Sequence, residues 1–312
     1  MSGGGPAPDG RPEILALFGP TGIGKTAVAV ALAERLRARG EDPVAISADA
    51  LQVYAGLETL TGAPTEDEHR RLEHRLVAFI PVSESFSVGQ YMPLAHREID
   101  AALAAGRRPI VVGGTGLYVR AALTELDLRP PPAPGVRERV EARLAARGPA
   151  ALHAELSRRS PAAAEGIDAA DRSRIGRALE SLEGGHHSLA VKAPGGESQL
   201  WTSETRRPTL LVGLLAERSA LYGRIGRRVS AMVAAGAGEE VRRAAAAGAS
   251  PTARAALGFE ELLAGDVEGL ERRTRNLAKR QLTWMRKLAG VHHVDVTGRD
   301  PGDVAEEIAV SL

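Results

Sequence analysis

A glycine-rich segment near the amino terminus restricts the fold more than any other feature of this 312-residue sequence. Gly19-Pro20-Thr21-Gly22-Ile23-Gly24-Lys25-Thr26 has the spacing G-x-x-x-x-G-K-[ST], in which backbone N–H groups and a helix N-terminus surround a phosphate. An apolar run at 14–18 precedes it, and a helical pattern follows to about residue 37. Strand, loop and helix in this order predict an α/β fold with a phosphate-binding loop.

The loop predicts the role of each of its residues but not the identity of its ligand. All eight residues, Gly19 to Thr26, are expected to bind a diphosphate group. Lys25 is expected to neutralise its charge, and the Thr26 hydroxyl to bind Mg²⁺ as the metal cofactor. ATP, GTP and isoprenoid diphosphates all present the same paired anions, so the loop alone does not distinguish among them.

The rest of the chain predicts one α/β core interrupted by helices. Apolar runs at 44–47, 76–80 and 109–112 read as further buried strands, with a helix at 90–105. After a proline-rich stretch at 129–135, the helices at 136–147, 149–158 and 171–182 have no strand among them. A strand at 209–214 follows, then helices at 218–235, 239–247, 253–263 and 267–288, a strand at 292–296 and a helix at 301–310. We therefore predict a P-loop NTPase-like parallel sheet flanked by helices, formed by 1–128 and 206–312, with an all-helical insertion domain at 129–205.

Charge is distributed unevenly along the chain. Residues 1–128 carry 12 basic and 16 acidic side chains, whereas residues 206–287 carry 16 basic and 8 acidic ones. The basic region indicates either a polyanionic partner or a solvated set of arginine-rich helices. The sequence has no cysteine, no secretory signal and no apolar run long enough to span a bilayer, so we expect a cytoplasmic protein that does not contact membranes.

An acidic residue is absent where P-loop kinases usually place one. The strand at 110–112 leads into Gly113-Gly114-Thr115-Gly116-Leu117-Tyr118 without an acid at its end. The acid follows the second strand instead, at Asp49 in Ser47-Ala48-Asp49-Ala50-Leu51-Gln52-Val53-Tyr54. Because open α/β sheets bind ligands at the carboxyl ends of their strands, Asp49 is a candidate base, and a helix N-cap is its alternative role.

Five motifs in this order resemble those of the tRNA dimethylallyltransferases. They are the glycine-rich loop, the segments 47–54 and 113–118, Arg174-Ile175-Gly176-Arg177-Ala178-Leu179-Glu180, and Ala278-Lys279-Arg280-Gln281-Leu282-Thr283-Trp284-Met285-Arg286. The resemblance covers about residues 14–287. It implies transfer of a dimethylallyl group from dimethylallyl diphosphate to N6 of the adenosine immediately 3′ of the tRNA anticodon.

The resemblance also implies roles for individual residues. Asp49 would accept the N6 proton, and Lys25 and Arg254 would stabilise the departing diphosphate. The acceptor base would be flipped out of the anticodon loop into a channel of the protein. Contacts with tRNA are expected from Asp49, Leu51, Gln52, Tyr54 and Thr115 in the channel, from Arg137, Arg174 and Arg177 in the insertion, and from Lys279, Arg280, Thr283 and Arg286 in the last motif. The arginines have an alternative role in surface ion pairs, and Trp284 in the core. We expect a monomer.

Two segments depart from the family pattern, and two other functions stay open at this point. Family members usually have Gly-Thr-Ala-Lys-Pro where this chain has Leu60-Thr61-Gly62-Ala63-Pro64. A usual Thr-Gly-Lys segment is replaced by residues 183–187, whose histidines show no metal-ligand spacing. The alternatives are a small-molecule kinase that uses ATP and a nucleic-acid-binding module with a vestigial loop.

Overall fold

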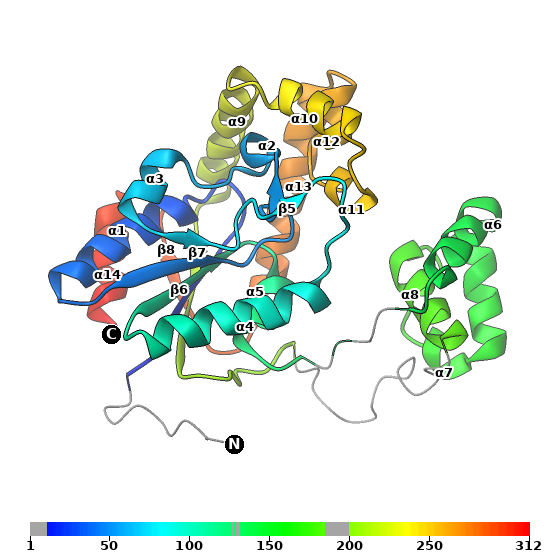
Figure 1. Ribbon diagram of the computed structural model, residues 1–312, viewed down its shortest axis with the longest axis horizontal. Helices are drawn as coiled ribbons and strands as arrows, with labels where there is room; N and C mark the ends of the chain where they lie inside the picture. The colour runs from blue at the N-terminus through cyan, green and yellow to red at the C-terminus, as the bar shows by residue number, and fades with distance from the viewer. Residues whose placement is uncertain (1–10, 127, 129–131, 185–199) are drawn as a thin grey trace. The chain divides into compact units, whose positions relative to one another are not determined.

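The computed structural model describes residues 11–126, 128, 132–184 and 200–312 (Figure 1). Contacts within the chain divide it into two compact units. The larger unit comprises residues 1–126 and 199–312, and the smaller one comprises residues 127–198. The first three residues of the proline-rich stretch at 129–135, and the histidines of the segment at 183–187, lie outside the described residues.

A six-stranded parallel sheet forms the centre of the larger unit, so the predicted α/β fold is confirmed. Its strand order is β4-β2-β6-β1-β7-β8. The strands are β1 (Ile14–Phe18), β2 (Pro43–Ser47), β4 (His74–Arg75), β6 (Arg108–Gly113), β7 (Thr209–Leu215) and β8 (Val291–Asp295). Because β6 lies between β1 and β2, the loops that follow these three strands open at one edge of the sheet.

The helices of the larger unit bury the sheet. Every residue of β1 and β2 is buried, as expected for apolar strands covered on both faces. Helix α1 (Lys25–Ala38) packs against α14 (Pro301–Val310), and α4 (Val88–Ala104) packs against α5 (Gly116–Leu123). Figure 1 shows these two pairs on opposite sides of the sheet.

Helix α3 (Glu66–Arg71) packs against α1 and leads into β4. The remaining helices of this unit are α2 (Glu58–Thr61), α9 (Arg218–Ala234), α10 (Ala237–Ala246), α11 (Pro251–Arg254), α12 (Phe259–Leu263) and α13 (Val267–Met285). The strands β3 (Tyr54–Ala55) and β5 (Ile80–Pro81) form a separate two-stranded sheet. None of the described helices combines the length and hydropathy that crossing a bilayer requires.

Two predicted elements are wrong. Most of the expected strand at 76–80 is absent: residues 76–79 form a bend between β4 and β5, since Leu76 and Ala78 have φ angles of 59° and 48° that no strand accommodates. The expected helix at 253–263 is divided into α11 and α12 at Gly258. Gly258 has φ 99°, and a Cβ there would lie 2.7 Å from Leu270. Glycine is therefore required at this break.

The smaller unit is helical within its described residues. It contains α6 (Val136–Arg159), α7 (Pro161–Ala164) and α8 (Arg172–Glu183), which bury a common apolar cluster around Val140, Leu152 and Leu179. Gly148, with φ 75° and ψ 164°, is not helical and separates α6 into two helical stretches, which confirms the two helices expected at 136–147 and 149–158. The assignment of this unit to tRNA contact stays a prediction.

Candidate active site

The loops after β1, β2 and β6 meet at the carboxyl edge of the sheet. Gly24, in a left-handed conformation with φ 96°, precedes α1 and lets the chain turn from the glycine-rich loop into the helix. At the end of β6, a Cβ on Gly113 would lie 2.3 Å from the carbonyl oxygen of Ala48. The absence of a side chain at Gly113 therefore allows the loop that carries Asp49 to approach the end of β6.

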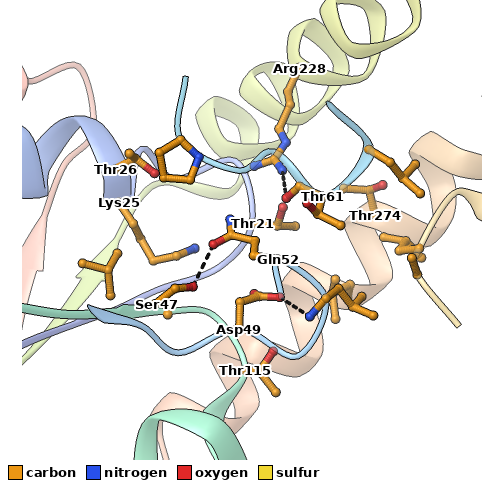
Figure 2. A pocket seen from close by; sticks show the side chains of 18 of the residues that line it. Thr21, Lys25, Thr26, Ser47, Asp49, Gln52, Thr61, Thr115, Arg228 and Thr274 are labelled. Carbon is orange, nitrogen blue, oxygen red and sulfur yellow. Dashed lines mark hydrogen bonds between the residues drawn. The ribbon is translucent and has the colours of Figure 1, made fainter. Parts of the chain in front are cut away.

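A cavity of about 160 Å³ lies among these loops and helices (Figure 2). Its polar lining includes Thr21, Lys25, Thr26, Asp49, Thr115 and Arg228. Its apolar lining, from α9, α13 and the α11–α12 connection, includes Val229, Met232, Leu257, Leu270 and Leu277. The cavity therefore offers charged groups for an anion and aliphatic side chains for a hydrocarbon in one space.

The ammonium group of Lys25 is enclosed by the glycine-rich loop. Its Nζ donates hydrogen bonds of 3.0 Å and 3.1 Å to the carbonyl oxygens of Gly19 and Pro20. Burial lowers the pKa of Lys25 to about 8, while the charge of Asp49 raises it and that of Arg228 lowers it. An anion in the cavity would supply the negative charge that this buried cation lacks.

The carboxylate of Asp49 is available to a ligand. Its Oδ1 accepts a 3.0 Å hydrogen bond from the backbone N–H of Leu51, and no helix begins there. The alternative role of Asp49 as a helix N-cap is therefore wrong. Figure 2 shows its side chain in the same space as those of Lys25, Thr115 and Arg228.

Arg228 on α9 is a cavity residue that sequence reasoning missed. Its Nη2 donates a 3.1 Å hydrogen bond to the carbonyl oxygen of Thr61. Burial lowers its pKa, while the charge of Asp49 raises it. No sequence signal separates Arg228 from its neighbour Arg227, because both lie in one arginine-rich helix and only the packing of α9 selects one of them.

A buried carboxylate fixes the loop that faces Arg228. Glu240 on α10 accepts hydrogen bonds of 2.9 Å and 2.7 Å from the backbone N–H groups of Thr59 and Leu60, at the start of α2. The carbonyl oxygens of the two following residues also accept hydrogen bonds. That of Thr61 accepts from Arg228, and that of Gly62 accepts from Nε2 of Gln52 at 3.0 Å. The segment at 60–64, whose sequence differs from the family pattern, thus forms part of the cavity wall.

The structure places the predicted channel residues unequally. Leu51, Gln52 and Thr115 line the cavity with Asp49. Tyr54 is 1% exposed, and its hydroxyl lies 2.6 Å from that of Thr252, so it is a buried structural residue in this state. It is not among the described residues that line the cavity.

Arg254 also lies outside the lining. Its guanidinium forms a 2.8 Å ion pair with Glu260 and stacks on the ring of Phe259. The contact of Arg254 with a diphosphate stays a prediction. The arginine that lines the cavity in this structure is Arg228.

The remaining predicted RNA contacts are exposed. Lys279, Arg280, Thr283 and Arg286 share the exposed face of α13. In the smaller unit, Arg137 and Arg174 form ion pairs with Glu180 and Asp171, and Arg177 is exposed. Trp284 packs against Trp201 at a ring distance of 4.6 Å, and a Cβ on Gly116 would lie 2.3 Å from its ring.

The lining suits a cation held mainly by a substrate. Among the described residues, no group of three or more His, Cys, Asp or Glu side chains forms a metal site of the protein's own. The Thr26 hydroxyl and the Asp49 carboxylate both line the cavity. Mg²⁺ typically takes one or two protein ligands and completes its shell with phosphate oxygens and water, so these residues fit it.

Sequence comparison places the chain among prenyl-transferring proteins. The family model "IPP transferase" matches residues 52–288, and the model "Isopentenyl transferase" matches residues 12–84. A tRNA dimethylallyltransferase of Thermobifida fusca is 40% identical over 303 residues, which cover 94% of this chain and 92% of that protein. A tRNA dimethylallyltransferase of Rhodospirillum centenum is 41% identical over 319 residues, covering 97% and 96%.

Solved structures agree with the sequence comparison. A full-length tRNA isopentenylpyrophosphate transferase of Bacillus halodurans has a TM-score of 0.66 and 33% identity, with 96% of each chain covered. A eukaryotic dimethylallyltransferase acting on tRNA has a TM-score of 0.67 at 21% identity, with 91% of this chain and 74% of that chain covered. The second similarity concerns the fold alone.

Proposed function

The chain belongs to the tRNA dimethylallyltransferase family, and on this premise we propose how its residues carry out the reaction. The enzyme is a prenyltransferase that moves a dimethylallyl group onto N6 of the adenosine immediately 3′ of the tRNA anticodon. A bond forms between N6 and C1 of the dimethylallyl group, the bond from C1 to the diphosphate oxygen breaks, and N6 loses a proton. The donor and the roles of the residues below are proposals.

The donor is dimethylallyl diphosphate, and the composition of the cavity carries this proposal. Its lining combines residues of the glycine-rich loop and the cations Lys25 and Arg228 with aliphatic side chains of α9 and α13. The diphosphate takes the loop amides and the cations, while the five-carbon group takes the aliphatic wall. A nucleotide would bring a ribose and a base, for which that wall offers few hydrogen-bonding partners.

Asp49 accepts the proton that leaves N6. The N6 lone pair is delocalised into the adenine ring, so the amine is a weak nucleophile until a carboxylate draws off its proton. One Asp49 oxygen is held by the N–H of Leu51, which orients the carboxylate. Thr115, in the neighbouring loop after β6, offers a hydroxyl to the base as it enters.

Lys25 and Arg228 stabilise the diphosphate as it leaves. Charge grows on the oxygen between C1 and phosphorus while its bond to C1 breaks, and two partly buried cations, with the Asp49 carboxylate near them, favour that charge. The hydroxyl of Thr26 and an oxygen of the diphosphate would hold Mg²⁺, which supplies additional neutralisation of negative charge when bound.

The exposed cations of α13 bind phosphates of the anticodon stem-loop, and the arginines of the smaller unit bind further tRNA phosphates or bases. We propose that the enzyme is a monomer and that it acts in the cytoplasm, where its tRNA substrates are found.

Transfer of labelled dimethylallyl groups tests this function. Purified protein incubated with tRNA and labelled dimethylallyl diphosphate, followed by digestion to nucleosides, should yield labelled N6-dimethylallyladenosine. Labelled γ-phosphate recovered from ATP in any product would instead support the kinase. Asp49→Asn should lower turnover by about 100-fold or more, with tRNA affinity retained. Asp42→Asn, next to the opposite end of β2, is the matched control and should retain full turnover.

A further inference from the structure

A single buried carboxamide joins two of the loops around the cavity. Gln281 on α13 is 8% exposed and lines the cavity. Its Oε1 accepts a 2.8 Å hydrogen bond from the backbone N–H of Thr21, in the glycine-rich loop. Its Nε2 donates a 2.8 Å hydrogen bond to the carbonyl oxygen of Gly114, in the turn after β6. One side chain thus connects the phosphate-binding loop to the turn that precedes Thr115.

The carboxamide packs closely against the turn after β6 on one of its sides. A Cβ on Gly114 would lie 2.7 Å from Nε2 of Gln281 and 3.2 Å from Nζ of Lys25. Turn, carboxamide and ammonium group are therefore packed directly against one another, and a shift of one displaces the others.

The carboxamide of Gln281 satisfies both loops with its two polar atoms. The contact needs an acceptor for the N–H of Thr21 and a donor for the carbonyl of Gly114, which a carboxamide combines. A glutamate retains the acceptor but loses the donor, and a leucine loses both. Each lost contact leaves a largely buried backbone group without its partner.

We propose that Gln281 is a positioning residue that sets the spacing between the diphosphate and the acceptor adenine. This inference rests on the proposed function, in which the loop after β1 holds the donor and the turn after β6 receives the base. Gln281 acts through the backbone of Thr21 and Gly114 rather than on the reacting atoms. Transfer needs C1 and N6 in near-attack contact, and a misplacement of about 1 Å costs about 100-fold in rate.

Gln281→Leu in the full-length enzyme tests the proposal. The rate constant of a single turnover at saturating dimethylallyl diphosphate and tRNA should fall about 100-fold. The Kd values of inorganic diphosphate and of tRNA should change by less than about 3-fold, because the loop amides, Lys25 and the face of α13 remain. Asn276→Leu removes a carboxamide from an exposed position of the same helix and should leave the rate constant and both Kd values unchanged.

A rate within about 3-fold of wild type, or a loss explained entirely by weaker binding, would overturn the proposal. Gln281→Glu, which has the same shape, covers the case in which the leucine variant does not fold. It should lose at least about 10-fold in the same rate constant, and a wild-type rate would refute the role. An inactive wild type would instead refute the proposed function, so the two failures are distinguishable.

A double-mutant cycle tests the contact itself. Gly114→Ala places a methyl group 2.7 Å from Nε2 of Gln281 and should slow transfer, whereas Gln281→Ala removes this closest contact and leaves those with the carbonyl oxygen of Gly19 and Nζ of Lys25 at 3.2 Å. The double variant should therefore be no slower than the slower single variant. Rate losses that multiply in the double variant would show that the two positions act independently and would contradict the proposal.

Discussion

Replacing Lys25 by methionine should remove a pH dependence from the stability of the free enzyme. Burial lowers the pKa of Lys25 from 10.5 to about 8 in the folded protein, so the charged form is disfavoured there relative to the unfolded chain. Below pH 8 both states hold the proton, and folding bears the full cost of the buried charge. Between pH 8 and 10.5 the unfolded state binds more protons, so stability rises with pH.

The magnitude follows from the two pKa values. A difference of 10.5 minus about 8 corresponds to about 3 kcal/mol, which is fully present at neutral pH and disappears above pH 10.5. Between pH 7 and pH 10, the free energy of unfolding of the wild type should therefore rise by about 2.5 kcal/mol relative to that of Lys25→Met.

Denaturant unfolding of both proteins at pH 7, 8, 9 and 10, without substrates, measures this difference. Comparing the two cancels the titration of all other groups. Lys279→Met, at an exposed position of α13, controls for the loss of one positive charge. Two results would refute the reasoning. One is a difference in free energy of unfolding between wild type and Lys25→Met that is the same at all four pH values. The other is a loss of wild-type stability relative to Lys25→Met as the pH rises.

Three further outcomes follow from the contacts described above. Arg228→Met should weaken binding of inorganic diphosphate by at least about 10-fold in calorimetric titration, whereas Arg227→Met, at an exposed position of the same helix, should change it by less than about 3-fold. Equal effects of the two variants would contradict the role of Arg228. Glu240→Gln should lower the free energy of unfolding by about 1–3 kcal/mol, because the N–H of Thr59 or of Leu60 then faces an amide group. Glu239→Gln on the exposed side of α10 should not move the unfolding midpoint, and equal midpoints for the two variants would contradict this. The affinity for tRNA should fall steeply with salt concentration. Replacing Lys279, Arg280 and Arg286 by alanine should reduce the slope of log affinity against log salt concentration by about 0.7 per lost phosphate contact. An unchanged slope would show that these residues do not contact RNA phosphates.

Local features of the sequence were sufficient to predict the start of the larger unit. The strand at 14–18, the glycine-rich loop and α1 follow one another without a gap, so each supports the identification of the next. Asp49 was predictable because it directly follows an apolar strand whose carboxyl end lies at the ligand edge. The run at 76–80 failed because apolar composition does not reveal the left-handed residues Leu76 and Ala78.

The parts of the site that come from distant helices were not predictable in the same way. Arg228 and Gln281 reach the cavity only because α9 and α13 pack over the glycine-rich loop. Tyr54 was expected in the channel because it belongs to the same motif as Asp49, yet the short β3 strand turns it into the protein. Motif membership identifies a neighbourhood in the chain, and tertiary packing decides which side chains in it reach a ligand.

The position of β6 between β1 and β2 fixes the distance between the loops that follow these two outer strands. Adjacent strands are about 4.8 Å apart, so the backbone after β1, which carries the anion, and the backbone after β2, which carries the Asp49 carboxylate, are held about 10 Å from each other. Loop substitutions cannot alter that separation, because the hydrogen-bonded ladder of the sheet sets it. Donors with longer hydrocarbon tails would therefore have to extend along the aliphatic wall, leaving the distance from leaving group to nucleophile the same for every chain length.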